Sequence, residues 1–231
     1  MLSREPLRIV DGILDYLGET SDDYVECYEE IARTYYLRRG PGLEVLSLFN
    51  LCDMLIQVFY PFGGSIIDVG CEFGYAINRI APAFFFRKAA LDISIEQLKQ
   101  VAGGITRIRA DAEDMPLLSG SFDVAICTNL FEHVKNEKAL VSELYRVLKS
   151  GGLLLFACPW KQDLSVYESK EYKERFRQYK WKHLRSVDEE TVKAAFSRFD
   201  ILARTEITSA MAEMELTPYS VIFILMRKKV E

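Results

Sequence analysis

From residue 65 onward, short apolar runs alternate with segments of helical periodicity. The apolar runs predict five strands, at 65–69, 88–93, 106–110, 122–128 and 153–158. The amphipathic segments between them predict helices at 75–81, 94–101 and 136–148. Two later apolar runs, at 199–208 and 219–227, predict an antiparallel pair because only a short polar segment separates them. Strands that alternate with helices indicate an α/β fold, with a parallel sheet covered by helices on both faces.

The first 60 residues follow a helical pattern instead. Apolar and aromatic positions recur at helical spacing over 24–36, and Gly40-Pro41-Gly42 then interrupts the pattern. A second helix is expected over 43–59. Residues 1–60 are therefore expected to form an N-terminal helical cap.

Composition narrows the class of protein. The chain has 231 residues, of which 49% are apolar, and this suits one domain with additions. A net charge of −5 disfavours a general nucleic-acid binder. The five cysteines include no Cys-x-x-Cys and the chain has two histidines far apart, so neither a disulfide framework nor a metal site is expected. Reduced thiols and a cytoplasmic location are the expectation.

No membrane span is expected. The most apolar window, 43–62, contains Glu44 and Asp53, and charges inside a span are costly in lipid. A buried or cap helix fits this window better. The segment 1–6 carries an acid and a proline where a signal peptide needs an apolar run.

The chemistry begins where the first predicted strand ends. Asp68 closes that strand, Gly70 and Gly74 follow in a short loop, and a helical pattern opens at residue 75. Glycine allows backbone N–H groups to approach a ligand because it has no Cβ. This strand–loop–helix order is typical of nucleotide-binding α/β units, although a sharp turn without a ligand gives the same pattern.

Two further acids close the next two predicted strands. Asp92 follows Asp68 by 24 residues, a spacing at which a carboxylate commonly accepts ribose hydroxyls. The alternative role for Asp92, a helix N-cap, suits Ser94 better. Asp111 ends the third strand, and a solvated loop acid is one interpretation of it.

Taken in order, these motifs resemble the class I S-adenosylmethionine-dependent methyltransferases, especially the branch of small-molecule and quinone-pathway enzymes that carries the methyltransferase type 11 domain. The resemblance is strong over about 24–158. The segments that carry it are Asp68–Gly74, Leu91–Ser94, Ala110–Pro116, Ser121–Cys127, Asn129–Val134 and Leu148–Leu153. It implies a Rossmann-like, doubly wound sheet of seven strands, mostly parallel with the last antiparallel.

The resemblance also implies a cofactor, S-adenosyl-L-methionine, which would leave as S-adenosyl-L-homocysteine. The residues it assigns to cofactor binding are Asp68, Gly70, Cys71, Glu72, Gly74, Asp92, Ile93, Asp111, Ala112 and Asn129. Within this set, the acid at Asp111 would bond the adenine amino group and Ala112 would offer a backbone N–H. Glu113 and Asp114 are expected to be solvated.

One residue departs from the family pattern. Glu72 stands where the family usually has glycine. Its carboxylate would pair with the ammonium or sulfonium charge of the cofactor, obstruct the pocket, or turn outward. The obstructing alternative keeps open a non-catalytic subunit that binds the cofactor or a partner.

Glu132 and His133 are the candidate catalytic residues. They are the one adjacent acid and imidazole in the chain, and a histidine can take a proton from an acceptor hydroxyl or amine. Helix-start positioning and packing is the alternative role for this pair. Cys158 has no partner motif, so a small strand-end residue is the simpler interpretation of it.

Four regions are expected along the chain. They are the helical cap at 1–60, the cofactor-binding core at 61–159, a lid or substrate insertion at 160–186, and a C-terminal helix and strand pair at 187–231. Aromatic residues alternate with Lys and Arg over 167–185. That pattern fits a lid packed over the cleft and, as an alternative, a nucleic-acid contact.

The sequence therefore predicts a methyltransferase that acts directly on a small-molecule acceptor. The alternatives are the non-catalytic subunit, a nucleic-acid or protein methyltransferase that uses 167–185, and a nicotinamide oxidoreductase. The oxidoreductase would share the first loop and Asp92 but would not explain Asp111 or the 129–133 segment. The tyrosines at 24, 28 and 35 are expected to help close the site or to pack.

Overall fold

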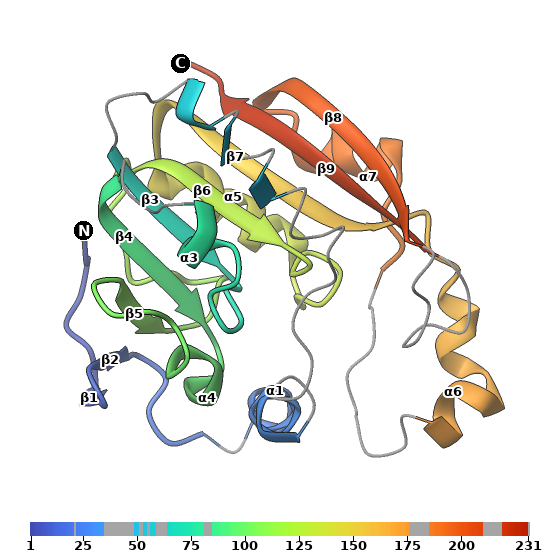
Figure 1. Cartoon of the computed structure of the whole chain (residues 1–231), viewed down its shortest axis with the longest axis horizontal. Coiled ribbons are helices and arrows are strands. Elements are labelled where there is room, and N and C mark those ends of the chain that lie inside the picture. The colour runs from blue at the N-terminus through green and yellow to red at the C-terminus, as the bar shows by residue number, and fades with distance from the viewer. Residues whose placement is uncertain are drawn as a thin grey trace.

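A twisted mixed sheet forms the centre of the computed structural model (Figure 1). The structure describes residues 1–20, 22–34, 49–50, 53–54, 56–58, 64–80, 85–175, 185–209 and 219–230. The strands of these residues are β1 (Arg8–Val10), β2 (Ile13–Asp15), β3 (Gly64–Val69), β4 (Phe85–Asp92), β5 (Thr106–Arg109), β6 (Phe122–Thr128), β7 (Leu148–Trp160), β8 (Phe199–Ser209) and β9 (Tyr219–Lys228). The helices are α1 (Asp23–Thr34), α3 (Ile77–Ile80), α4 (Ile95–Leu98), α5 (Glu137–Val147), α6 (Lys170–Arg175) and α7 (Glu189–Ala195), with a 3-10 turn at Leu164–Glu168.

The strand order within the described residues is β1-β2-β5-β4-β3-β6-β7-β9-β8. All neighbours from β2 to β7 are parallel, whereas β9 is antiparallel to both β7 and β8. The sequence prediction of a parallel sheet followed by an antiparallel pair is confirmed. The order reverses beside β3, and ligands of open α/β sheets bind at such a switch point, outside the carboxyl ends of the strands.

The predicted strand number is wrong, because nine strands rather than seven form this sheet among the described residues. The two additional strands, β1 and β2, fall within the segment 1–60 that was expected to be helical. They form a hairpin around Asp11 and Gly12, whose φ angles of 51° and 74° fit a two-residue turn of the primed type. β2 then extends the parallel sheet by pairing with β5.

The other cap predictions have mixed outcomes. The helix expected over 24–36 is α1, which the structure describes as Asp23–Thr34. The helix expected over 43–59 falls largely outside the described residues. Among the described residues, no helix combines the length and the apolar character that crossing a bilayer would require.

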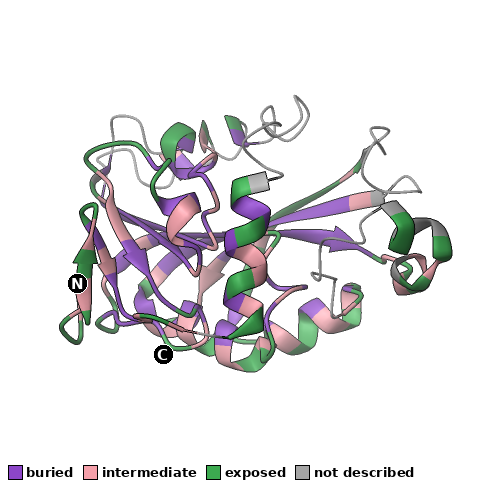
Figure 2. Cartoon of the chain, turned by 90° about the horizontal axis from the view of Figure 1, so that it is seen from below, coloured by how far each residue is buried: buried purple, intermediate pink, exposed green. Residues whose placement is uncertain are grey.

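Apolar side chains fill both faces of the sheet. On one face, Ile67 and Val69 of β3 pack in the same cluster as α5 and α7 residues such as Leu144 and Val192. On the other face, Ile66 belongs to a cluster with α3 and α4. Figure 2 shows strands that are mostly buried, whereas α1 alternates buried and exposed residues along its length. The sheet is therefore covered on both faces, as a doubly wound fold requires.

A buried ion network fixes the hairpin to the sheet edge. Asp15 ends β2 with no exposed surface, and its carboxylate accepts from Arg8 Nε at 2.7 Å and from Arg109 Nη1 at 3.2 Å. The backbone N–H groups of Leu17 and Gly18 donate to the other oxygen, Oδ1. Arginine and hydrogen bonds together hold the pKa of Asp15 below its usual value despite its burial.

We predict that Arg109→Met lowers the free energy of unfolding by about 3 kcal/mol, because the buried Asp15 carboxylate then keeps, among the described residues, only the partly exposed Arg8 as a cationic partner. Urea denaturation monitored by circular dichroism measures this loss. Arg107→Met is the matched control, since Arg107 lies on the same strand and its side chain binds a backbone oxygen, that of Asp11. Equal losses in the two variants would contradict the prediction.

Candidate functional site

The loop after β3 folds over the end of β4. The N–H groups of Gly70 and Cys71 both donate to the carbonyl of Leu91, at 2.8 and 3.1 Å. The next N–H, that of Glu72, donates to Asp92 Oδ2 at 2.9 Å. These three amides, which the glycine motif was expected to offer to a ligand, therefore bind the neighbouring strand.

Gly70 cannot be replaced without strain. Its φ is +71°, and a Cβ on it would lie 2.9 Å from the side chain of Leu130. The loop is thus held between β4 and the segment that follows β6. Glu72 adopts φ +49° two residues later, a conformation that usually costs a non-glycine residue about 1 kcal/mol.

Asp92 is the best-anchored acid of the site. It is 6% exposed, and its two oxygens accept from the N–H groups of Glu72 and Ser94, each at 2.9 Å. Burial raises the pKa of Asp92 to about 6, although both hydrogen bonds oppose the shift. Each oxygen keeps a second acceptor position, which can serve a hydroxyl donor.

A cavity of about 260 Å³ opens at the carboxyl ends of β3 to β6. Nine predicted site residues line it, namely Gly70, Glu72, Asp92, Ile93, Asp111, Ala112, Asn129, Glu132 and His133. Three predicted residues, Asp68, Cys71 and Gly74, are not in its lining and lie buried behind it. The structure therefore brings most of the predicted site residues together around one cavity.

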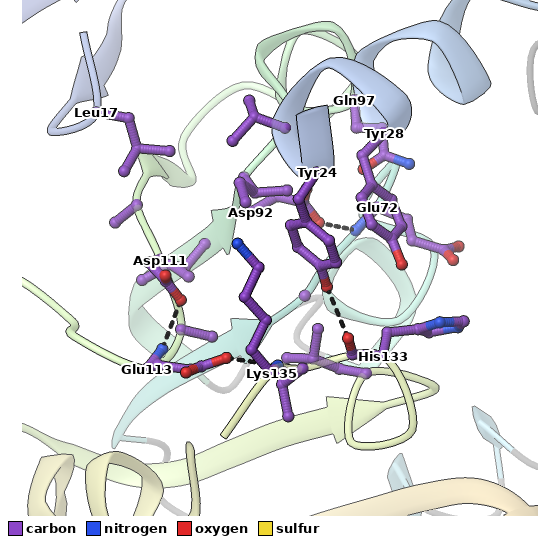
Figure 3. Close-up of a pocket in the computed structure, with 18 of the residues that line it drawn as sticks. Leu17, Tyr24, Tyr28, Glu72, Asp92, Gln97, Asp111, Glu113, His133 and Lys135 are labelled. Carbon is purple, nitrogen blue, oxygen red and sulfur yellow. Dashed lines mark hydrogen bonds between the residues drawn. The ribbon is translucent and has the colours of Figure 1, made fainter. Parts of the chain in front are cut away.

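The helix α1 roofs this cavity. Tyr24, Val25, Tyr28 and Ile31 of α1 all line it. Tyr24 Oη donates to the carbonyl of His133 at 3.0 Å, which ties the helix to the loop after β6 (Figure 3). The expectation that the first two tyrosines help to close the site is supported, whereas Tyr35 lies outside the described residues.

A second tie crosses the cavity mouth. Lys135 Nζ lies 3.2 Å from Asp22 Oδ2 at the start of α1, and 5.0 Å from the centre of the Tyr24 ring. Both charged side chains are about half exposed, so this ion pair adds little stability. The ion pair instead connects the start of α1 to the loop after β6 at one side of the cavity.

The adenine end of the predicted site is organised by two acids. Asp111 Oδ1 accepts from the N–H of Glu113 at 2.8 Å, and Figure 3 places both side chains at the end of the cavity opposite Glu72 and Tyr28. Glu113 Oε1 in turn accepts from the N–H groups of Lys135 and Asn136. Glu113 was expected to be solvated, and the structure instead places it in the lining, where it holds the loop after β6.

Glu132 and His133 lie together under α1. Glu132 is 1% exposed, and its Oε1 is 3.8 Å from His133 Nε2. The His133 ring meets Tyr28 edge-on at 6.1 Å. Arg185 holds this loop from the other side, because its guanidinium donates to the carbonyls of Phe131 and Val134. One cation of the segment 167–185 therefore has a structural role.

Asp68 serves the scaffold in this structure. It is 1% exposed, Oδ2 accepts from the N–H of Ile77 at 3.2 Å, and Oδ1 has no hydrogen-bond partner among the described residues. Burial, with smaller contributions from Glu72 and Asp92, raises the pKa of Asp68 to about 8. The side chain is thus expected to be protonated at neutral pH.

The predictions on metal ligands and on Cys158 can be compared with the part of the chain that the structure describes. No group of three or more His, Cys, Asp or Glu side chains there is arranged to hold a metal ion. Cys158 is fully buried, and burial raises the pKa of its thiol well above the usual value. Its burial fits the interpretation of Cys158 as a small strand-end residue.

Comparison with known proteins shows which family the central part of the chain resembles. Residues 67–156 match the family described as "Methyltransferase domain". Residues 67–156 of this chain therefore resemble a methyltransferase domain. A 2-methyl-6-phytyl-1,4-hydroquinone methyltransferase of Synechocystis is 32% identical over 165 residues, which are 66% of this chain and 48% of that protein. A ubiquinone/menaquinone C-methyltransferase of Rhizobium johnstonii is 42% identical over 117 residues, or 45% of each chain.

Structural comparison agrees with the fold of this region. An S-adenosylmethionine-dependent methyltransferase of Mesorhizobium loti shares the fold with a TM-score of 0.58 and 22% identity, over 72% of this chain and 91% of that one. The chain spans about half the length of the curated relatives just described. S-adenosylmethionine is the cofactor that the family implies, and the acids at the ends of β4 and β5 fit the hydroxyl and amine donors of its adenosine part.

We predict that stability depends on pH through Asp68. A folded-state pKa near 8, above the unfolded value of 3.8, means that the folded protein binds this proton more tightly. Asp68 therefore costs stability increasingly as the pH rises from about 4 to 8. The difference in unfolding free energy between Asp68→Asn and wild type should therefore shift by about 2 kcal/mol in favour of the variant from pH 6 to pH 8.

Urea unfolding at the two pH values measures that difference. Asp114→Asn is the control, because Asp114 is 73% exposed. A difference between wild type and Asp68→Asn that stays constant with pH would show that Asp68 titrates normally.

Proposed function

We propose that this protein transfers a methyl group from S-adenosylmethionine directly to a small-molecule acceptor. The observation that carries the proposal is one cavity at the carboxyl ends of β3 to β6, lined by Asp92 and Asp111 and roofed by α1. The family match over 67–156 supports the choice of cofactor. A roofed cavity suits such a reaction because methyl transfer to the acceptor must exclude water.

The predicted cofactor-binding residues would contact different parts of S-adenosylmethionine. Asp92 would accept hydrogen bonds from the ribose hydroxyl groups at the acceptor positions that the N–H groups of Glu72 and Ser94 leave open. Asp111 would accept from the adenine amino group, and Ala112 would add its backbone N–H. Gly70 and Asn129, with Ile93, would form the walls around these groups.

Glu132 and His133 would together remove a proton from the acceptor. When bound, S-adenosylmethionine supplies a methyl group already activated by a sulfonium. If the acceptor atom carries a proton, His133 would take it, and Glu132, whose Oε1 is 3.8 Å from Nε2, would stabilise the resulting imidazolium. This division assigns the base to His133 and the supporting charge to Glu132.

The charge of the lining favours a neutral or cationic acceptor. The acidic residues among the described lining are Asp22, Glu72, Asp92, Asp111, Glu113 and Glu132. Lys135 is the one lysine or arginine in the described lining, and it is paired with Asp22. Phosphate-rich acceptors would be repelled, so nucleic acid is the weaker alternative. The relatives named for hydroquinone and quinone methylation support a small acceptor.

We predict that S-adenosylmethionine and S-adenosylhomocysteine bind the purified protein in calorimetric titration and that NADH does not. Asp92→Ala should weaken both affinities about 10- to 100-fold, because hydrogen bonds to a charged group are lost. Glu96→Ala is the matched control, since Glu96 lies nearby, outside the described lining. If neither S-adenosylmethionine nor S-adenosylhomocysteine binds, the proposed function is overturned. Binding of NADH would favour an oxidoreductase.

A second candidate function rests on Glu72. This residue places a carboxylate in the lining where the family usually has glycine, at a φ that favours glycine. A side chain that blocked the methionine part of the cofactor would leave a non-catalytic subunit. Figure 3 shows the Glu72 side chain beside Tyr28, directed away from Asp92 and Asp111, so it leaves the ribose and adenine positions open.

We therefore predict that Glu72→Gly changes the affinity for S-adenosylmethionine by no more than about threefold. Calorimetry of the two proteins measures the ratio, and thermal unfolding checks that both are folded. A gain of tenfold or more in the glycine variant would instead show that Glu72 obstructs the site and would favour the non-catalytic subunit.

A further inference from the structure

Glu29 lies inside the protein although it belongs to an amphipathic helix. It is 8% exposed on α1, and its side chain reaches the start of α4. Oε1 accepts from the N–H of Ile95 at 2.7 Å, and Oε2 accepts from Ser94 Oγ at 2.9 Å and from the N–H of Glu96 at 3.2 Å. One carboxylate thus satisfies three donors of the turn that follows β4.

The same turn carries Asp92. Ser94 links the two acids, because its N–H donates to Asp92 Oδ1 while its hydroxyl donates to Glu29. The chain of contacts Glu29–Ser94–Asp92 continues to the N–H of Glu72. A side chain on the roof of the cavity is therefore connected, through two hydrogen bonds, to the carboxylate in its wall.

The charge of Glu29 is compensated inside the protein. Arg109 Nη2 lies 3.6 Å from Oε1, and the same guanidinium donates through Nε to the carbonyl of Ile93 at 3.1 Å. The residues on both sides of Ser94 are thus fixed, Ile93 by arginine and Ile95 by glutamate. Such buried ionic contacts hold one geometry because each donor and acceptor would be costly to leave unpaired.

We propose that Glu29 is a positioning residue for cofactor binding, which holds the 92–96 turn so that the Asp92 carboxylate faces the ribose hydroxyls. The inference rests on the proposed function. It gives α1 two separate roles, since Tyr24 and Tyr28 cover the cavity while Glu29 shapes its wall. Hydrogen bonding between remote parts of a site can fix a ligand-binding group in this way.

Glu29→Gln is the sharpest variant, because it conserves shape and removes half of the acceptors. Both oxygens of Glu29 receive donors, so an amide NH₂ in either place would face an N–H or the Ser94 hydroxyl. Glu26→Gln is the matched control, since Glu26 lies on the same helix, is exposed, and is not in the described lining.

The first experiment is a double-mutant cycle on S-adenosylhomocysteine affinity, measured by calorimetry with Glu29→Gln and Asp92→Asn singly and together. If Glu29 acts through Asp92, Glu29→Gln weakens binding about tenfold in the wild-type background and less than about twofold in the Asp92→Asn background. Glu26→Gln changes neither. Equal weakening in both backgrounds, or none in the wild type, would overturn the inference.

The second experiment needs no cofactor. Hydrogen exchange by NMR follows the amides of Glu72 and Ser94, which donate to Asp92. In Glu29→Gln, but not in Glu26→Gln, both amides should exchange about tenfold faster. Unchanged exchange at these amides would refute the positioning role. If wild-type protein binds neither adenosyl ligand, the proposed function fails by itself, and the exchange rates still decide whether Glu29 holds the turn.

Discussion

The site depends on one buried carboxylate that joins two loops. Asp92 accepts from the N–H of Glu72, in the loop after β3, and from the N–H of Ser94, in the turn after β4. These hydrogen bonds fix the relative positions of two segments that parallel strands alone would leave adjustable. The strands bring the loops to one edge of the sheet, and Asp92 then determines how they meet. The Asp92 carboxylate therefore has two roles, since it holds the two loops together and also keeps acceptor positions for a ligand in the cavity.

The N-terminal segment contributes more than a cover. Its hairpin lengthens the sheet beside β5, its helix roofs the cavity, and Asp15 and Glu29 surround the guanidinium of Arg109 from two elements. Replacing a buried ion network by apolar residues is often neutral for stability, so stability alone does not account for it. Here the network has a clear geometric result, since it fixes β2, α1 and the end of β5 around a single side chain.

Much of this arrangement could be predicted because the signals are long. The strands β3 to β9 and the helix α5 follow apolar runs or periodic patterns of four residues or more, and Asp92 and Asp111 stand where those runs end. The hairpin was missed because β1 and β2 have three residues each, too few for a period to emerge. The Asp11-Gly12 pair between Val10 and Ile13 was the signal that could have found it.

Other site residues had no signal in the sequence. Glu29 is one of several acids on an amphipathic helix, and nothing in its neighbours distinguishes it from the exposed Glu26. Lys135 and Asp22 come together from segments more than 100 residues apart. Leu17 and Thr20 also line the cavity without belonging to any motif. Tertiary contacts of this kind depend on how the helix α1 docks, which a local pattern does not specify.

The pairing of β2 with β5 has a consequence for how the chain acquires its structure. Ile13 lies opposite Arg107, and Asp15 lies opposite Arg109, so β2 is synthesised before its partner strand β5, which follows about 94 residues later. Contacts of such long sequence separation form late, because the intervening loop must first be ordered. During synthesis, the carboxylates of Asp15 and Glu29 therefore stay solvated until Arg109 has been made, after β3 and β4. The helix α1 can dock over the cavity only after the strands that form its base have been synthesised.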